Sequence, residues 1–288
     1  MARRSKAEQT IEDWFPKEEI VFNDRKMLGV EIDLWFPKYK LASEVDDPMW
    51  HTEFHGRDEN YHANKFQAIM NKSWQFLTFS NQDVKERADL AKSIIERDIF
   101  KTYKINVKMC KPTKASVEEM QQFVLNNSLN SVRIDKAIML GLDDKKGLAS
   151  VVYGHYTYDI DGSKQFVVCD WVHRPGVTVL GGFVKSISDV ASTLNLRYIP
   201  CMFAGGSANL AISELALHGH REYTFCTPAY KLVKNAKVFQ ESELDNSVGY
   251  ARMYDYGKVR FCYTNPKGTH KTLESSELPF VEPYSMKT

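Results

Sequence analysis

The sequence predicts an α/β protein in which a small mixed sheet flanked by helices precedes a second α/β domain. Its 288 residues are enough for two modest domains. Helix-like and strand-like patterns alternate over residues 1–100, give way to a basic stretch at 101–114, and resume over 115–240. We therefore expect a first domain at 1–100, a linker or boundary strand at 101–114, a second domain at 115–240, and a C-terminal hairpin or tail at 241–288.

The first domain is predicted to have the order α-β-β-α-β-α, which fits a mixed sheet between helices. Its helical segments carry apolar residues at helical spacing, and its strands are short apolar runs bounded by turn residues such as Pro37 and Lys38. The expected elements are a helix at 5–15, strands at 30–36 and 39–45, a helix from Tyr61, a strand at 74–79 and a helix at 81–100.

The second domain is predicted to begin with a helix, because Ser116 is followed by Glu118 and Glu119 in the first helical turn. The turn at Gly181 and Gly182 leads into a later helix, and backbone amides at the start of such a helix form a ready anion site. The other expected elements are strands at 137–142, 147–156, 164–173, 197–203 and 222–227, and a helix at 208–220.

Composition excludes several classes of protein. The net charge of +1 argues against a protein that coats DNA, so any nucleic-acid binding has to come from local basic patches. The five cysteines are scattered and form no CxxC pair, which indicates reduced thiols and argues against a zinc ribbon or a disulfide framework. No apolar run is long enough to span a membrane, and the basic N-terminus leads into no apolar segment. We expect a cytoplasmic protein that is not secreted and has no membrane partner.

Acidic residues gather around the hairpin expected at 30–45. Asp33 lies in the middle of the first strand, and Glu44 and Asp46 share one face of the second. Like charges opposed across a hairpin are destabilising unless something neutralises them, and Mg²⁺ is a natural neutraliser. His51 could carry protons near neutral pH. The alternative, that these carboxylates line a solvated edge of the hairpin, stays open.

The stretch EIDLWFPKYKLASEVDDPMWHTE resembles the nuclease core of phage-type homing endonucleases of the PD-(D/E)xK superfamily, close to the very-short-patch-repair (Vsr-like, EDxHD-like) branch. That pattern reads approximately ExDIYxPxxxLAIEYxGxxWHSE. The likeness extends to SKAEQTI, NDRKML, YHANK, WQFLTFSNQD and GVTVLGGFVKSI. It implies a restriction-endonuclease-like fold for the first domain and a metal-dependent, site-selective cleavage of double-stranded DNA.

The resemblance implies a role for each matching residue. The catalytic residues are Glu8, Asp33, Glu44, His51 and Lys65, the metal ligands are Asp33, Glu44 and Asp46, and the accessory positions are His62 and Asp83. The metal is Mg²⁺, with Mn²⁺ as a substitute. Ser43, Asp46, Asp47 and Pro48 depart from the family pattern. The extra negative charge of Asp46 either strengthens metal binding or spoils it, so a DNA-binding protein with a decayed nuclease site remains an alternative.

The second domain resembles the GNAT acyltransferase fold, whose glycine-rich turn grips a pyrophosphate. Here only Gly181 and Gly182 are paired and the motif is incomplete, so we expect a GNAT-like fold that helps to hold DNA, with an acyltransferase as the enzymatic alternative. The candidate DNA contacts are Lys185, His173, Arg174, Lys231 and Lys234. One nuclease site cuts one strand, so a double-strand cut would imply a homodimer.

Overall fold

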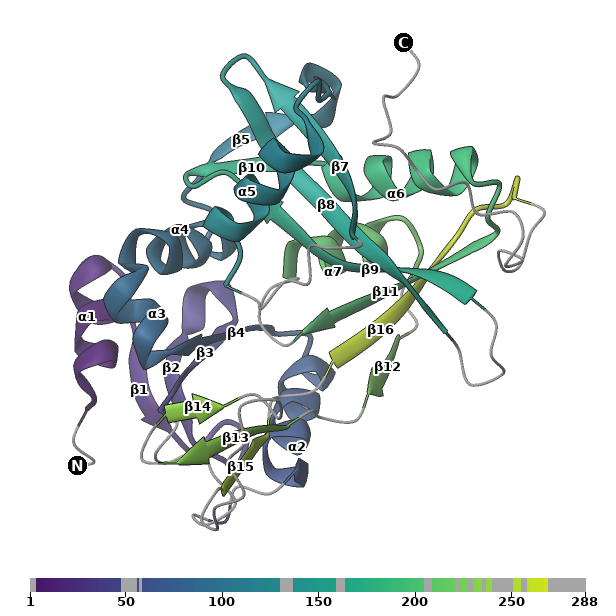
Figure 1. Ribbon diagram of the computed structural model, residues 1–288. Coiled ribbons are helices and arrows are strands. Elements are labelled where there is room, and N and C mark those ends of the chain that lie inside the picture. Colours follow the sequence, from purple (N-terminus) through teal and green to yellow (C-terminus); the bar gives the residue numbers. More distant parts are fainter. Residues whose placement is uncertain are drawn as a thin grey trace. The chain divides into compact units, whose positions relative to one another are not determined.

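The computed structural model has a mixed α/β architecture, which confirms the predicted fold class (Figure 1). Its packing divides the chain into two compact units. Unit 1 comprises Met1–Ile99, Ala204–Ser207 and Phe225–Val259, and unit 2 comprises Phe100–Phe203, Ala208–Thr224 and Arg260–Thr288. The structure describes residues 4–47, 56, 59–129, 137–158, 164–204, 209–220, 223–226, 230–234, 237–239, 251–254 and 258–268.

Unit 1 is built on a four-stranded mixed sheet with the order β1-β2-β3-β4. The strands are β1 (Val21–Asp24), β2 (Ile32–Phe36), β3 (Leu41–Asp46) and β4 (Gln75–Ser80). β2 is antiparallel to β1 and β3, whereas β3 and β4 are parallel. The turn between β2 and β3 is a short 3-10 helix, η1 (Pro37–Tyr39), and Lys40 after it adopts a left-handed conformation with φ of 51°. The sequence did not indicate β1, which is half-buried along its whole length and therefore lacks alternation.

Four helices accompany this sheet: α1 (Lys6–Trp14), α2 (Glu59–Asn71), α3 (Asn81–Glu86) and α4 (Ala88–Asp98). α2 connects the parallel strands β3 and β4, as parallel pairs require a crossover. The single helix expected at 81–100 is wrong, because the chain leaves the helical conformation at Arg87 (φ −125°, ψ 39°) and starts again. The core between sheet and helices consists of fully buried apolar side chains such as Ile11, Phe36 and Phe76.

A second, three-stranded sheet also belongs to unit 1 and has the order β14-β13-β15. Its strands are β13 (Tyr230–Lys234), β14 (Lys237–Phe239) and β15 (Ala251–Tyr254), and both pairings are antiparallel. The sequence places 225–240 with the second domain. The difference arises because strand pairing and packing join distant parts of the chain, and a local sequence pattern does not indicate such contacts.

Unit 2 contains a seven-stranded sheet with the order β12-β16-β11-β9-β8-β7-β6. The strands β7, β8 and β9 form an antiparallel meander, and β9 and β11 are parallel. The bounds are β6 (Lys111–Pro112), β7 (Ala137–Asp144), β8 (Gly147–Tyr158), β9 (Lys164–His173), β11 (Tyr198–Ala204), β12 (Tyr223–Cys226) and β16 (Lys258–Thr264).

In the described residues of unit 2, three α-helices and a two-stranded sheet accompany the large sheet. The helices are α5 (Val117–Asn127), α6 (Gly182–Thr193) and α7 (Asn209–Leu217). β5 (Tyr103–Asn106) is parallel to β10 (Val177–Leu180), and β6 joins the large sheet through β7. The basic stretch at 101–114 therefore contributes strands to unit 2. Across the described ranges, no helix is both long enough and apolar enough to cross a membrane.

Candidate functional site

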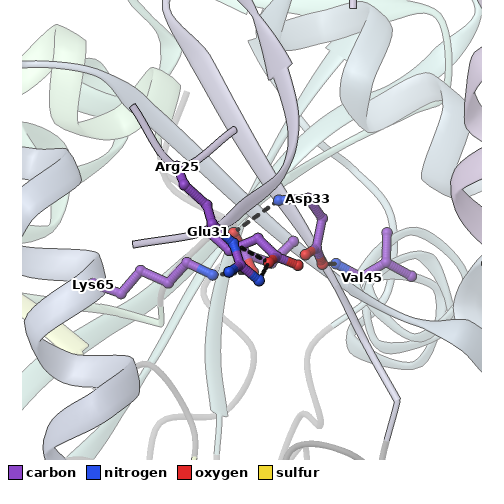
Figure 2. A network of polar contacts seen from close by, with 6 residues as sticks. Arg25, Glu31, Asp33, Val45 and Lys65 are labelled. Carbon is purple, nitrogen blue, oxygen red and sulfur yellow. Dashed lines mark hydrogen bonds and ion pairs between the residues drawn. The ribbon is translucent and has the colours of Figure 1, made fainter. Parts of the chain in front are cut away.

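The hairpin of β2 and β3 brings Asp33 and Glu44 together. Leu34 pairs with Ser43, so Asp33 and Glu44 occupy the next positions of the antiparallel ladder. The backbone N–H of Asp33 donates to Oε1 of Glu44 at 3.4 Å, and the N–H of Val45 donates to Oδ2 of Asp33 at 2.9 Å (Figure 2). Two carboxylates that the sequence places opposite each other are thus neighbours in the structure.

Lys65 forms an ion pair with Glu44 in the interior of unit 1. Its Nζ lies 2.5 Å from Oε2 of Glu44, and the side chains are 3% and 1% exposed. Figure 2 shows the lysine extending from its helix toward the carboxylates. Burial raises the pKa of Glu44 well above its usual value, the charge of Asp33 raises it further, and the charge of Lys65 opposes both. Burial acts to lower the pKa of Lys65, but the charges of Glu44 and Asp33 raise it overall.

Glu8 adds a third carboxylate, from α1, and it is buried as Glu44 is. The Oγ of Ser5, the N-cap residue, accepts from the N–H of Glu8 at 3.1 Å, which fixes the start of the helix and the position of this residue. Burial raises the pKa of Glu8, a hydrogen bond from Ser5 lowers it, and the charges of Asp33 and Glu31 raise it further. Within the described part of the chain, Oε2 of Glu8 is buried without a hydrogen-bond partner.

Glu31 is a member of this site that the sequence did not single out. It directly precedes β2, two residues before Asp33, and its charge raises the pKa of Glu8 as that of Asp33 does. The guanidinium of Arg25 donates to its Oε2, through Nε at 2.7 Å and also through an Nη (Figure 2). The available signal was the first glutamate of the ExD pattern, which matches Glu31. We refer to Glu8, Glu31, Asp33 and Glu44 as the acidic cluster.

The other predicted site residues of unit 1 have different surroundings. Asp46 ends β3, and its charge also raises the pKa of Glu44. Asp83 forms a capping box at the start of α3, since its Oδ2 accepts from the N–H of Ser80 at 3.1 Å and from the Oγ at 2.6 Å. His62 is buried on α2 beside Tyr61, with the ring centroids 5.1 Å apart. The prediction for His51 lies outside the described residues.

The acidic cluster fits a Mg²⁺ ion by the chemistry of its donors. In the ranges that the structure describes, no three His, Cys, Asp or Glu side chains are arranged to hold a metal ion. Mg²⁺, however, keeps several waters and usually binds through one or two carboxylates. Asp33 and Glu44 supply two adjacent carboxylates, and Glu8 supplies a buried oxygen that lacks a hydrogen bond. Burial is the main cause of the raised pKa values of Glu8 and Glu44, and the charge of Asp33 adds to it; a bound cation would favour the charged form of both carboxyl groups.

The turn before α6 in unit 2 holds a carboxylate of the chain itself. Gly181 adopts a left-handed conformation with φ of 77° at the N-cap of the helix. Glu214 of α7 accepts hydrogen bonds from the N–H groups of Gly181 at 2.6 Å, Phe183 at 3.1 Å and Val184 at 3.4 Å. Burial raises the pKa of Glu214 to about 7, and these backbone hydrogen bonds oppose the rise. The amides that the sequence offers to an external anion therefore bind Glu214.

Two of the candidate DNA contacts form ion pairs inside unit 2. Arg174 lies 2.5 Å from Oδ2 of Asp144 and donates to the carbonyl oxygen of Leu148 at 2.9 Å, so it holds the turn between β7 and β8. Lys185 pairs with Asp189 one turn along α6. His173 is buried, with its ring centroid 4.2 Å from that of Trp171. Lys231 and Lys234 belong to β13, and their side chains are outside the described part of the structure.

No protein-family model and no curated protein match the sequence. The crystal structure of an N-acetyltransferase from Staphylococcus aureus Mu50 matches at 10% sequence identity over 54% of this chain and 96% of that chain, with a TM-score of 0.30. Similarity of this degree identifies neither a shared fold nor a shared activity.

Proposed function

We propose that this chain is a Mg²⁺-dependent, site-selective DNA endonuclease of the homing type. It acts on double-stranded DNA inside a bacterial or phage-infected cell, and Mn²⁺ replaces Mg²⁺. The observation that supports this proposal most is the buried ion pair of Lys65 and Glu44 beside Asp33, at the hairpin whose sequence resembles the PD-(D/E)xK nuclease core. A buried charge pair is not needed to stabilise a fold, because apolar residues of similar size often do so as well or better.

The acidic cluster would hold the metal ion. Asp33 and Glu44 are its proposed ligands, and Glu8 completes the set or orients a water. When bound, Mg²⁺ polarises a phosphate oxygen and makes a bound water easier to deprotonate. Lys65 favours the charged form of Glu44 and orients it, and Glu8, with its raised pKa, is suited to accept a proton from water.

Unit 2 is proposed to help hold the DNA. If both strands are cut, the second nuclease site is proposed to come from the other subunit of a homodimer. The acyltransferase alternative requires the backbone amides at the start of α6, and those amides bind Glu214. Saturable binding of acetyl-CoA to the parent protein, lost on changing Gly181, would favour that alternative.

Digestion of a mixed library of phage genomes, with Mg²⁺ or with EDTA, tests the proposal. We expect discrete DNA fragments or nicks in Mg²⁺ and intact DNA in EDTA. A protein with a decayed site would bind DNA, as seen by a gel shift, but would leave it intact in Mg²⁺ as well as in EDTA. Intact DNA in Mg²⁺ would contradict the proposed activity. Sequencing the ends of the fragments would then identify the target.

A further inference from the structure

The pairing of β8 with β9 contains a bulge at Cys169. Tyr153 pairs with Asp170, and the next pair along the ladder is Gly154 with Val168, so Cys169 is the extra residue on β9. An extra residue in one strand changes the direction of the side chains around it, and bulges are frequent beside active sites for this reason.

The bulge directs the Cys169 side chain to the face of the sheet that α5 covers. Cys169 packs against a buried cluster that includes Val151 and Tyr153 of β8 and Val124 of α5. Side chains two residues apart share a face, so His155 continues the row of Val151 and Tyr153. Sγ of Cys169 lies 3.1 Å from Nδ1 of His155, which is within hydrogen-bond distance. Cys169 is half-buried and His155 is exposed.

We propose that Cys169 and His155 form a nucleophilic thiol–imidazole pair, a covalent modification site for small compounds with an electrophilic carbon. A nucleophilic cysteine with a base within hydrogen-bond reach is the arrangement that activates a thiol. Nδ1 of His155 takes the thiol proton, the sulfur forms a bond to the electrophilic carbon, and the leaving group departs with the bonding electrons. The imidazolium then releases its proton to water.

Cys169 is only partly exposed, so small reagents reach it more easily than large ones. Other titratable groups lie nearby. Packing against the cluster under α5 leaves the sulfur only partly accessible. Burial raises the pKa of the neighbouring Tyr153, as do the charges of Asp170 and Cys169, so this phenol stays protonated. Asp170 is buried, and its Oδ2 accepts a hydrogen bond from Oγ of Ser128 at 3.3 Å.

The other described cysteines have settings that do not activate a thiol in this way. Burial raises the pKa of Cys110, and the charges of Asp144 and Asp143 raise it further. Cys201 is fully buried, which raises its pKa. Cys262 is exposed on β16 and serves as an internal reference for the reactivity of an accessible thiol.

The test is the rate at which iodoacetamide alkylates each cysteine of the folded protein at neutral pH, followed by peptide mass spectrometry. In this reagent the leaving group is iodide. An isolated thiol is only a few per cent thiolate at neutral pH, so we expect His155→Gln to slow the alkylation of Cys169 on the order of tenfold while Cys262 keeps its rate. His218→Gln, which changes another exposed histidine of unit 2, should leave both rates unchanged.

A slowing at Cys169 of about threefold or more, with Cys262 unaffected, supports the pair. A smaller change, or an equal change at both cysteines, overturns it. The circular dichroism spectrum and the thermal midpoint of the His155→Gln protein show whether it is folded. Because Cys201 is fully buried in unit 2, a general opening of the unit would be seen as new labelling at Cys201 in the same sample.

Discussion

The ammonium of Lys65 lies 2.5 Å from a carboxylate oxygen of Glu44, and water reaches almost none of either side chain. The pair joins α2 to the hairpin of β2 and β3, at the point where Asp33 contacts Glu44 through its backbone. Removing either partner leaves a charge in a place with little solvent, where its free energy is high. The stability of unit 1 and the proposed metal chemistry therefore depend on the same two residues.

Lys65→Met retains most of the side-chain volume and removes the charge. We expect it to lower the free energy of unfolding by about 3 kcal/mol, because Glu44 is left buried without its counterion. Urea denaturation measures the change, and the double variant with Glu44→Gln should recover much of the loss. Lys85→Met, at an exposed position of α3, serves as the matched control. A loss below about 1 kcal/mol would mean that a proton, water or another cation neutralises Glu44.

Glu8→Gln tests the repulsion within the acidic cluster. The substitution removes a carboxylate whose pKa is raised first by burial and then by the charges of Asp33 and Glu31, so we expect the metal-free protein to become more stable by about 1 kcal/mol. DNA cleavage should fall at the same time, because residues that destabilise a fold are retained where function needs them. Urea denaturation in EDTA and a cleavage assay provide the two measurements. A variant that is less stable than the parent would show that Glu8 is held by favourable contacts instead.

Addition of Mg²⁺ should stabilise unit 1. A ligand that binds only the folded state adds about 1.4 kcal/mol at roughly ten times its dissociation constant. We expect the thermal midpoint to rise with Mg²⁺, to return to its original value in excess EDTA, and to respond little to Mg²⁺ in Asp33→Asn. An equal response in the parent and in Asp33→Asn would place the ion elsewhere.

Glu214 makes the stability of unit 2 depend on pH. Its folded pKa of about 7 is above the ordinary value of 4.5, so the folded state holds the proton more tightly than the unfolded state. The stabilising contribution is complete below the ordinary pKa and is lost as the pH rises through the folded one. Between pH 4.5 and 7 the parent should therefore lose stability relative to Glu214→Gln, by an amount on the order of 2 kcal/mol. Parallel pH profiles for the two proteins would contradict this account.

The hairpin of unit 1 could be predicted because its physical cause is local. The period of two along each strand and the turn residues at the centre of 30–45 fix which side chains share a face, and so Asp33 and Glu44 could be placed near each other from the sequence. Lys65 could be located only through the family resemblance, because nothing in the spacing of α2 indicates that this lysine turns inward. The lysine can be buried because its ammonium pairs with the carboxylate of Glu44.

Other features arise from contacts between distant parts of the chain. Glu214 reaches the turn at Gly181 from a different helix, and a sequence pattern shows the glycines but not the carboxylate that fills their anion site. The break at Arg87 occurs without glycine or proline, so it follows from packing rather than from a local signal. The bulge at Cys169 likewise depends on the register of two strands.

The rate at which Asp33→Asn cleaves DNA in Mg²⁺ tests the central proposal most directly. Asp13→Asn, which changes an exposed carboxylate of α1, is the matched control. We predict that Asp33→Asn folds normally but cuts at least about a hundredfold more slowly than the parent, whereas Asp13→Asn cuts at the parental rate. Cleavage by Asp33→Asn at the parental rate would contradict the assignment of the acidic cluster as the nuclease site.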